Sequence, residues 1–175
     1  MAQANQREPQ LYRFEDDGKT PNNAQLPLLL YCNALSTPGE RDPAASYEAL
    51  FAAHGWTDSW RNGIHGFLHF HACAHEVLGI ARGEAQVQFG GDNGRLLTVK
   101  AGDVVVLPAG TGHRRLSASN DLLVVGAYPS SGSYDQWRPG EIGHDEALER
   151  IAKVPSPAQD PVYGEHGPLT RLWER

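Results

Sequence analysis

The chain has 175 residues, 40% of them hydrophobic and 21% charged, which is enough to bury one core without disulfide bonds. Its net charge of −6 and the lack of an extended Lys/Arg run disfavour nucleic acid as a partner, and apolar runs such as LPLLLY are too short to cross a membrane. Two cysteines, Cys32 and Cys73, cannot form a disulfide framework and the opening MAQANQREPQ is unlike a signal peptide, so we expect a cytoplasmic protein with reduced thiols.

The N-terminal part of the chain predicts two strands and one helix. Residues 25–32 (QLPLLLYC) form an apolar run, and Pro27 favours an edge strand because proline donates no hydrogen bond to a sheet. Asp42 followed by Pro43 is an N-cap and first-turn signal, and Gly55 marks the end of the helix. The expected elements are strands at 11–15 and 25–32 and a helix at 43–54.

Between residues 62 and 128, short β-rich runs alternate with Gly and Pro turns. The loop GGDNG at 90–94 is typical of a hairpin turn between two of these runs. Because no long helices alternate with the runs, the pattern argues for an all-β sandwich or barrel. Strands are expected at 64–72, 76–82, 84–89, 95–100, 103–107 and 121–127, with Leu78, Ile80, Val87, Val105 and Val124 in the core.

The chain beyond residue 129 predicts one more helix, at 144–153 (HDEALERIAK), with Ala147, Leu148 and Ile151 along one side. The run PSPAQDP that follows is a proline-rich connector. The end of the chain, PVYGEHGPLTRLW, carries aromatic and apolar residues, so we expect it to pack against the main fold or against a partner subunit.

Four of the eight histidines fall within eleven residues, at His65, His69, His71 and His75. Residues two apart on a strand point to the same face, so the imidazoles of His69 and His71 are able to converge on one point. Glu76 begins the next strand, and a carboxylate there reaches the same point from a neighbouring strand. Histidine and carboxylate in this pattern indicate a metal site.

A second segment, GDVVVLPAGTGH at 102–113, adds a candidate ligand. It predicts a strand, then a turn fixed by Pro108 and Gly110, and then His113 just past the turn. A histidine in this place is a candidate fourth metal ligand.

The two segments resemble the two signature motifs of the cupin family. Ser117 stands where the second motif usually has an Asn that packs, and this departure leaves the metal site intact. The runs HFHACAHEVLG and PVYGEHGPL resemble the YjlB-like subgroup of cupins. The matching positions are Gly63, His69, His71, Glu76 and Gly83 for the first motif and Gly102, Pro108, Gly110 and His113 for the second.

This resemblance implies an all-β fold, the double-stranded β-helix or jelly-roll barrel, here with two peripheral helices. The chain is then a single domain, 1–175, with a cupin core at about 62–128 and with arms 1–61 and 129–175 packing on the barrel. A homodimer is also implied, being common in the family. In such cupins the metal ligands are the residues that correspond here to His69, His71, Glu76 and His113.

Three neutral imidazoles and one carboxylate suit one divalent transition metal, Fe, Mn, Ni, Cu, Co or Zn, and are too rich in nitrogen for Ca or Mg. On a six-coordinate ion, four protein ligands leave two positions for water, a small-molecule ligand or O₂, whereas a closed tetrahedral zinc site leaves none. The alternative is a polar cluster without metal, which is costly inside a barrel unless its groups are paired.

Two further histidines are candidate catalytic residues. His65 shares strand parity with His69 and His71, which points it toward the barrel mouth as an acid or base; a satisfied polar residue is the alternative. His75 directly precedes Glu76, so on one strand the two point to opposite faces. Its alternatives to catalysis are a supporting or surface position and a place among the ligands.

Several other residues near the motifs favour structural roles. Trp56 and Trp60 are expected to pack rather than to line a substrate site. Arg114 and Arg115 predict a solvated pair, with binding of an anionic substrate at the barrel rim as the alternative. Cys73 is expected to be a small buried residue rather than a redox group.

The sequence therefore predicts a metal-binding protein that takes a small-molecule ligand. One hypothesis is a metal-dependent enzyme, in which the metal is a Lewis acid or binds O₂ and substrate together while His65 or His75 moves a proton. Dioxygenase and isomerase chemistries both occur in cupins. The alternatives are a non-catalytic module that binds a small ligand or a metal, and a structural cupin with an incidental metal; the fold does not choose between them.

Overall fold

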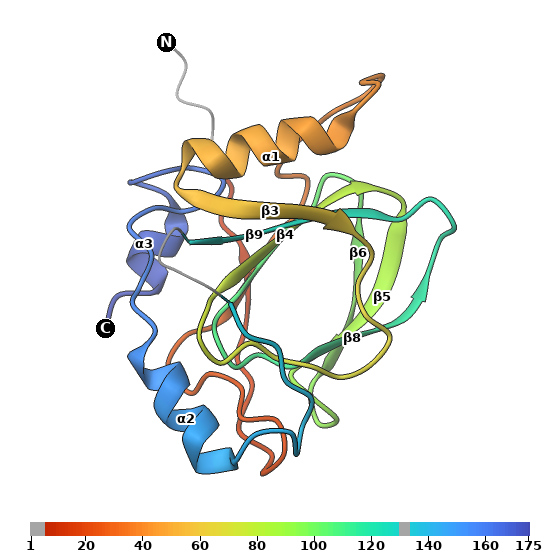
Figure 1. Ribbon diagram of the computed structural model, residues 1–175. Helices are drawn as coiled ribbons and strands as arrows, with labels where there is room; N and C mark the ends of the chain where they lie inside the picture. Colours follow the sequence, from red (N-terminus) through yellow and green to blue (C-terminus); the bar gives the residue numbers. More distant parts are fainter. Residues whose placement is uncertain (1–5, 130–133) are drawn as a thin grey trace.

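Two antiparallel β-sheets and three helices make up residues 6–129 and 134–175, the part of the chain that the structure, a computed structural model, describes (Figure 1). The strands are β1 (Gln10–Tyr12), β2 (Leu28–Tyr31), β3 (Trp56–Asn62), β4 (Glu76–Arg82), β5 (Glu84–Phe89), β6 (Arg95–Lys100), β7 (Val104–Leu107), β8 (His113–Ala118) and β9 (Leu123–Pro129). The helices are α1 (Pro43–Ala53), α2 (His144–Lys153) and α3 (Pro168–Leu172).

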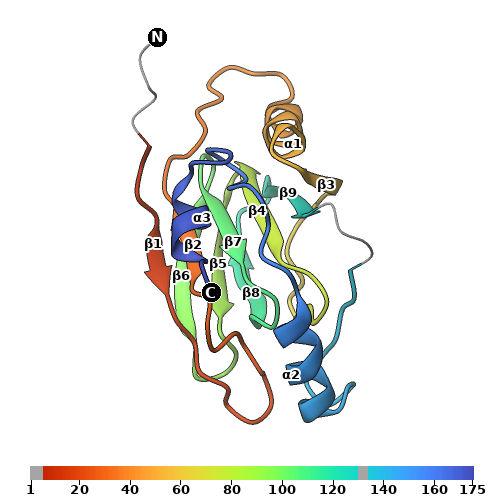
Figure 2. The ribbon, with the colours of Figure 1, turned by 90° about the vertical axis from the view of Figure 1, so that its left-hand side faces the viewer.

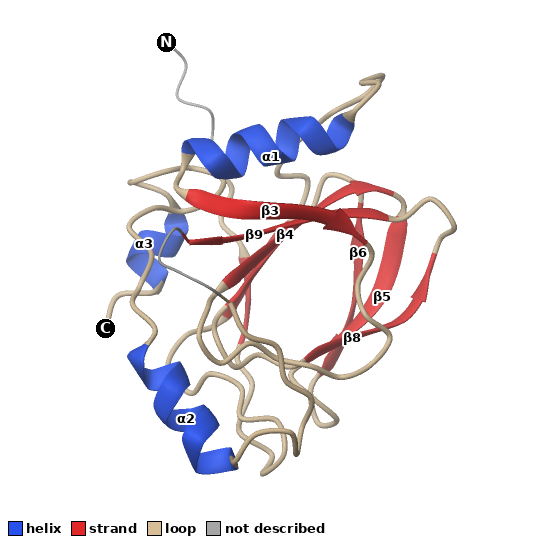
Figure 3. Ribbon diagram, viewed as in Figure 1, coloured by secondary structure: helices blue, strands red, loops and turns tan. Residues whose placement is uncertain are grey.

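The larger sheet has six strands in the order β1-β2-β7-β4-β9-β3, and the smaller has three in the order β6-β5-β8. Neighbouring strands are antiparallel in both sheets. Figure 3 shows the helices on the outside of the sheets. Antiparallel sheets with few helices fit the jelly-roll β fold that the sequence predicts.

The core between the two sheets is built from alternate residues of the central strands. Leu78 and Ile80 of β4 share one apolar cluster with Val87 of β5 and Val99 of β6, which joins the larger sheet to the smaller. This alternation follows from the period of two along a strand. The five predicted core residues are all confirmed as buried members of this cluster: Leu78, Ile80, Val87, Val105 and Val124.

The other face of the larger sheet is also buried, because α1 covers it. Tyr47 and Phe51 of α1 pack in one cluster with Val77 and Val104. Gly79 permits this contact, since a Cβ added there would stand 2.3 Å from Cδ1 of Tyr47. Burial on both faces explains why β4 and β7 read as continuous apolar runs in the sequence.

Both predicted helices are confirmed, and the sequence signals for the first act as expected. Oδ1 of Asp42 accepts a hydrogen bond from the backbone N–H of Ala45, at 3.4 Å, and Pro43 occupies the first turn of α1. The helix ends at Ala53, and Gly55 takes a φ of +76° that lets the chain turn into β3. The third helix, α3, was not predicted.

The C-terminal segment is fixed to the larger sheet by buried polar contacts. The hydroxyl of Tyr31 donates to the carboxylate of Asp160, which also accepts from the backbone N–H of Leu169 at 3.0 Å. The indole N–H of Trp173 donates to the carbonyl of Pro27 at 2.9 Å. The aromatic end of the chain therefore lies on the main fold.

Several predicted strands need correction. Most of 64–72 is irregular, and only isolated bridges at His69 and Phe70 remain of it. The strands β3 and β8 were not predicted. The edge position expected for 25–32 is wrong, because β1 pairs with β2 and takes the edge itself (Figure 2). Within residues 6–129 and 134–175, no helix is both long enough and apolar enough to cross a membrane.

Candidate metal centre

A backbone pairing sets two of the predicted histidine ligands side by side. The N–H of His69 donates to the carbonyl of His113 at 3.2 Å, and the N–H of His113 donates to the carbonyl of His69 at 3.0 Å. The two imidazole centroids are consequently 4.0 Å apart. Helix α2 supports this region from behind, because Ile151 is buried in one apolar cluster with Phe70 and Ala109.

The three histidines present the same nitrogen to a common point. Nδ1 of His69 faces the carbonyl of Phe67 at 3.0 Å, and Nδ1 of His113 faces the carbonyl of Thr111 at 3.0 Å. Nδ1 of His71 faces the carbonyl of Asp135. In a neutral imidazole each Nδ1–H then donates to a carbonyl, which leaves the Nε2 lone pair for a cation.

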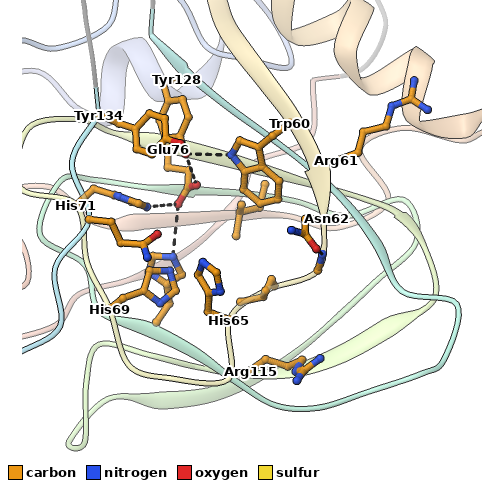
Figure 4. A pocket seen from close by; sticks show the side chains of 15 residues that line it. Trp60, Arg61, Asn62, His65, His69, His71, Glu76, Arg115, Tyr128 and Tyr134 are labelled. Carbon is orange, nitrogen blue, oxygen red and sulfur yellow. Dashed lines mark hydrogen bonds and ion pairs between the residues drawn. The ribbon is translucent and has the colours of Figure 1, made fainter.

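The candidate ligand atoms of His69, His71 and His113 all lie within 4.8 Å of one another, and all three residues are buried. Glu76 lies beside them, with its Oε2 3.1 Å from Nε2 of His71 and 3.4 Å from Nε2 of His113 (Figure 4). The structure therefore brings together the four residues that the sequence singled out as metal ligands.

A chain of hydrogen bonds orients the Glu76 carboxylate. The hydroxyl of Tyr128 donates to Oε1 of Glu76 at 3.2 Å, and the indole N–H of Trp60 donates to the Tyr128 hydroxyl at 3.0 Å (Figure 4). Gly126 leaves room for this indole, because a Cβ there would stand 2.1 Å from Cε2 of Trp60. Oε2 of Glu76 is thereby left facing the imidazoles.

The electrostatics of the cluster show which protons a cation would replace. Burial would raise the pKa of Glu76, but His71 and His113 hold it well below the usual range. Burial would lower the pKa of His71, and the charge of Glu76 outweighs this and raises it. Burial, with the neighbouring His113, lowers the pKa of His69 to about 3. The donor set fits a divalent transition metal, which would replace the proton that His71 and Glu76 share.

Residues 134–138 lie along one side of the site, and Asp135 holds them there. Its carboxylate accepts from the backbone N–H groups of Ala72 at 2.9 Å and Cys73 at 2.8 Å, and from the indole N–H of Trp137 at 2.6 Å. Together with the His71 contact, these bonds hold this segment against the loop that carries the ligands.

The four candidate ligands open into a pocket of about 350 Å³, which is the size of a small-molecule site. Trp60 belongs to its wall, so the expectation that this residue only packs is wrong. Its other side chains include Tyr128 and Tyr134, whose rings stack at 4.4 Å between centroids. The described residues that line the pocket are Trp60, Arg61, Asn62, Gly63, Ile64, His65, His69, His71, Glu76, Leu78, His113, Arg115, Tyr128, Tyr134 and Gln136.

His65 is an exposed residue that lines this pocket, at its mouth. Its ring stacks on Phe67, with 4.5 Å between centroids, and stands 5.1 Å from the ring of His69. Burial, with the nearby His113, lowers the pKa of His65, which favours the neutral imidazole. A neutral imidazole at the mouth is able to accept a proton from a bound molecule.

His75 lies away from the pocket, which speaks against the catalytic role expected for it. Its Nδ1 accepts from the backbone N–H of Ala109 at 2.9 Å, and its Nε2 lies 3.1 Å from the carbonyl of Pro155. The ring packs against Trp173 at 4.8 Å, and burial lowers its pKa to about 4. Both nitrogens of His75 are occupied, so the structure gives it a structural position.

The remaining residues of interest divide between pocket and periphery. Arg115 lines the pocket, whereas Arg114 turns to Gln88, with 2.7 Å from Nε to Oε1. Trp56 is buried, as expected. Cys73 is exposed rather than buried, which corrects the expectation for it.

Sequence signals for several pocket residues were weak or missing. Tyr134 and Gln136 come from the segment after the last strand, 63 and 65 residues beyond His71 in the sequence, and nothing local marks them as pocket residues. Tyr128 ends an apolar strand, where its hydroxyl was the one available signal. Only the tertiary fold brings these side chains to the site.

Two sequence comparisons find proteins related to this chain. A sequence model described as cupin matches residues 56–137. The uncharacterized protein YjlB of Bacillus subtilis (strain 168) is 42% identical over 168 residues, which cover 96% of this chain and 98% of YjlB.

Solved structures give weaker likenesses. Acireductone dioxygenase from Bacillus anthracis, with a cadmium ion in its active centre, is 14% identical with a TM-score of 0.41, covering 64% of this chain and 82% of its own. A mutant of Bacillus subtilis oxalate decarboxylase is 19% identical with a TM-score of 0.38, covering 64% and 27%. The 11S allergen of Cocos nucifera is 15% identical with a TM-score of 0.37, covering 53% and 31%. At TM-scores this low, none of these likenesses carries an argument about function.

Proposed function

The chain belongs to the cupin family, and from that premise we propose that it is a metal-dependent enzyme acting on a small molecule. Its cation would be held by Nε2 of His69, His71 and His113 and by the Glu76 carboxylate. The observation that carries the proposal is the convergence of three imidazoles, each with Nδ1 on a carbonyl, beside a buried carboxylate. A cluster of this kind is costly to bury unless its charges are shared with a cation or with one another.

Several residues that line the pocket would have defined roles in such a reaction. A divalent transition metal would supply Lewis-acid chemistry or a place for O₂, as in dioxygenase- or isomerase-type reactions. Trp60 and the stacked rings of Tyr128 and Tyr134 provide flat aromatic surface along one side of the pocket. His65 at the mouth would accept or return a proton. Tyr128 keeps Glu76 oriented, since burial and then the charge of Glu76 raise the pKa of its hydroxyl and keep it protonated.

Metal content tests the ligand set directly. The wild-type protein should hold about one equivalent of metal by elemental analysis, and His69→Ala should lose most of it because three ligands remain. His144→Ala is the matched control, since His144 lies on α2 in an ion pair with Asp16 outside the pocket. Full metal occupancy in His69→Ala would contradict the assignment.

A non-catalytic module that binds a small ligand is the second candidate, because the pocket and the metal cluster serve binding equally well. Oxygen consumption by the iron-loaded protein over catechols, thiols and keto acids separates the two. Uptake with any of these substrates supports the enzyme. Ligand binding without turnover, across several metals, supports the module instead.

The proposal includes a closed barrel and a homodimer, which the family resemblance implies, and a cytoplasmic location, which the cysteine content and the polar N-terminal sequence favour. In support of a dimer, β1 stands at a sheet edge and exposes Leu11, and such an edge is a ready surface for a second copy. Light scattering on the purified protein tests this, and a monomer at micromolar concentration would contradict it.

A further inference from the structure

The charges along the pocket are unbalanced once a metal is bound. The described lining residues include two guanidinium groups, Arg61 and Arg115, and one carboxylate, Glu76. Arg61 is already neutralised, because it pairs with Asp42 at 2.9 Å and with Glu48 at 2.6 Å. Glu76 would offset half the charge of a divalent cation. The pocket would then carry one positive charge at the metal and another at Arg115.

Of the two guanidinium groups in the pocket, Arg115 is the one that has no side-chain partner among the residues that the structure describes. Among the described residues, no hydrogen bond or ion pair engages its side chain, whereas its neighbour Arg114 contacts Gln88 and lies 3.9 Å from Asp92. The two side chains differ because successive residues of β8 point to opposite faces. A free guanidinium beside a cavity is suited to a planar anionic group.

Arg115 is exposed and lines the pocket, which places it at the pocket's mouth. Its backbone N–H donates to the carbonyl of His65 at 2.9 Å, so the two residues share the mouth. Its guanidinium lies over Gly66, where a Cβ would stand 3.6 Å from a guanidinium nitrogen. Figure 4 shows Arg115 below His65, with Trp60 on the other side of His65.

We propose that the pocket takes a small planar carboxylic acid whose carboxylate pairs with Arg115 while its other end reaches the metal centre. The inference rests on the proposed function, because it assumes the cation beside Glu76. The stacked rings of Tyr128 and Tyr134 and the indole of Trp60 offer flat apolar faces for the body of such a molecule. A neutral ligand would gain only an ordinary hydrogen bond from Arg115, without the charge-assisted pairing that a carboxylate makes.

The test compares two probes that share a metal-binding end and differ in charge at the other end. These are 3,4-dihydroxybenzoate and 3,4-dihydroxybenzamide, titrated calorimetrically into the zinc-loaded full chain. The wild type should bind the acid about five- to tenfold more tightly than the amide, as expected for one partly exposed charge-assisted pair. In Arg115→Gln the preference for the acid over the amide should disappear, with zinc content unchanged.

Arg114→Gln is the matched control, since it removes the same charge from the neighbouring residue on the other face and should keep the preference for the acid. Arg115→Lys should recover part of the preference. Equal binding of acid and amide by the wild type, an unchanged preference in Arg115→Gln, or no binding of either probe at millimolar concentration would overturn the inference.

Zinc content separates failure of this inference from failure of the metal centre. A protein that holds stoichiometric zinc and shows no preference for the acid keeps the metal centre and refutes the anion site. A protein that holds no zinc but prefers the acid in an Arg115-dependent way refutes the metal centre and keeps the anion site.

Discussion

Replacing His75 with alanine separates a structural histidine from the metal ligands one and four residues away. The change leaves the backbone N–H of Ala109 without its acceptor in a buried place, which costs about 1–3 kcal/mol. It also removes the ring that packs 4.8 Å from Trp173, and the resulting cavity costs about 1–3 kcal/mol. The carbonyl of Pro155 turns to solvent at little cost, because Pro155 is exposed.

The free energy of unfolding should therefore fall by about 2–6 kcal/mol in His75→Ala. Urea denaturation of the metal-free protein measures it, read as a lower midpoint at unchanged slope. The metal content of the folded variant should stay close to that of the wild type, because both nitrogens of His75 are turned away from the pocket.

His65→Ala provides the comparison, since His65 is exposed and its loss should change stability by only about 0.5 kcal/mol. If His75→Ala unfolds at the wild-type midpoint yet loses metal or activity, the structural role given to His75 is wrong.

Three further predictions follow from the same geometry. Tyr128→Phe should weaken metal binding about tenfold by removing the hydroxyl that orients the buried carboxylate, and Tyr134→Phe should leave metal titrations unchanged. Gly126→Ala should destabilise the fold by about 1–3 kcal/mol and shift the fluorescence of Trp60, whereas Gly143→Ala, whose added Cβ meets nothing closer than 3.8 Å, should leave that fluorescence unchanged. Chelation should lower the melting temperature by about 5–10 °C relative to protein at a free metal concentration about 100 times Kd, and a melting temperature indifferent to chelator would contradict a metal bound to the native state.

The spacing of the two motifs was sufficient to locate the candidate ligands, although one part of the reasoning was wrong. His69 and His71 were expected to converge because they lie two apart on a strand. The segment is mostly irregular, and the convergence comes instead from the His69–His113 bridge and from carbonyls that hold each Nδ1. The motif spacing therefore predicts which residues converge. The local backbone structure that brings them together depends on residues far away in the sequence.

The missed elements share a physical cause. The strand β3 reads WTDSWRN and is half exposed, and β8 reads HRRLSA and is exposed beyond His113, so neither shows the apolar alternation that reveals a strand. Both strands exist because they pair with β9 and β5. Trp60 of β3 was noticed as an aromatic residue but was expected only to pack, because nothing in the sequence showed that β3 borders the pocket.

Anomalous diffraction from crystals grown with one transition metal would locate the bound cation and its ligands. We expect a single strong peak at about 2.0–2.2 Å from Nε2 of His69, His71 and His113, with the Glu76 carboxylate as the fourth protein ligand. A peak bound by other residues, or none between these imidazoles at saturating metal, would contradict it.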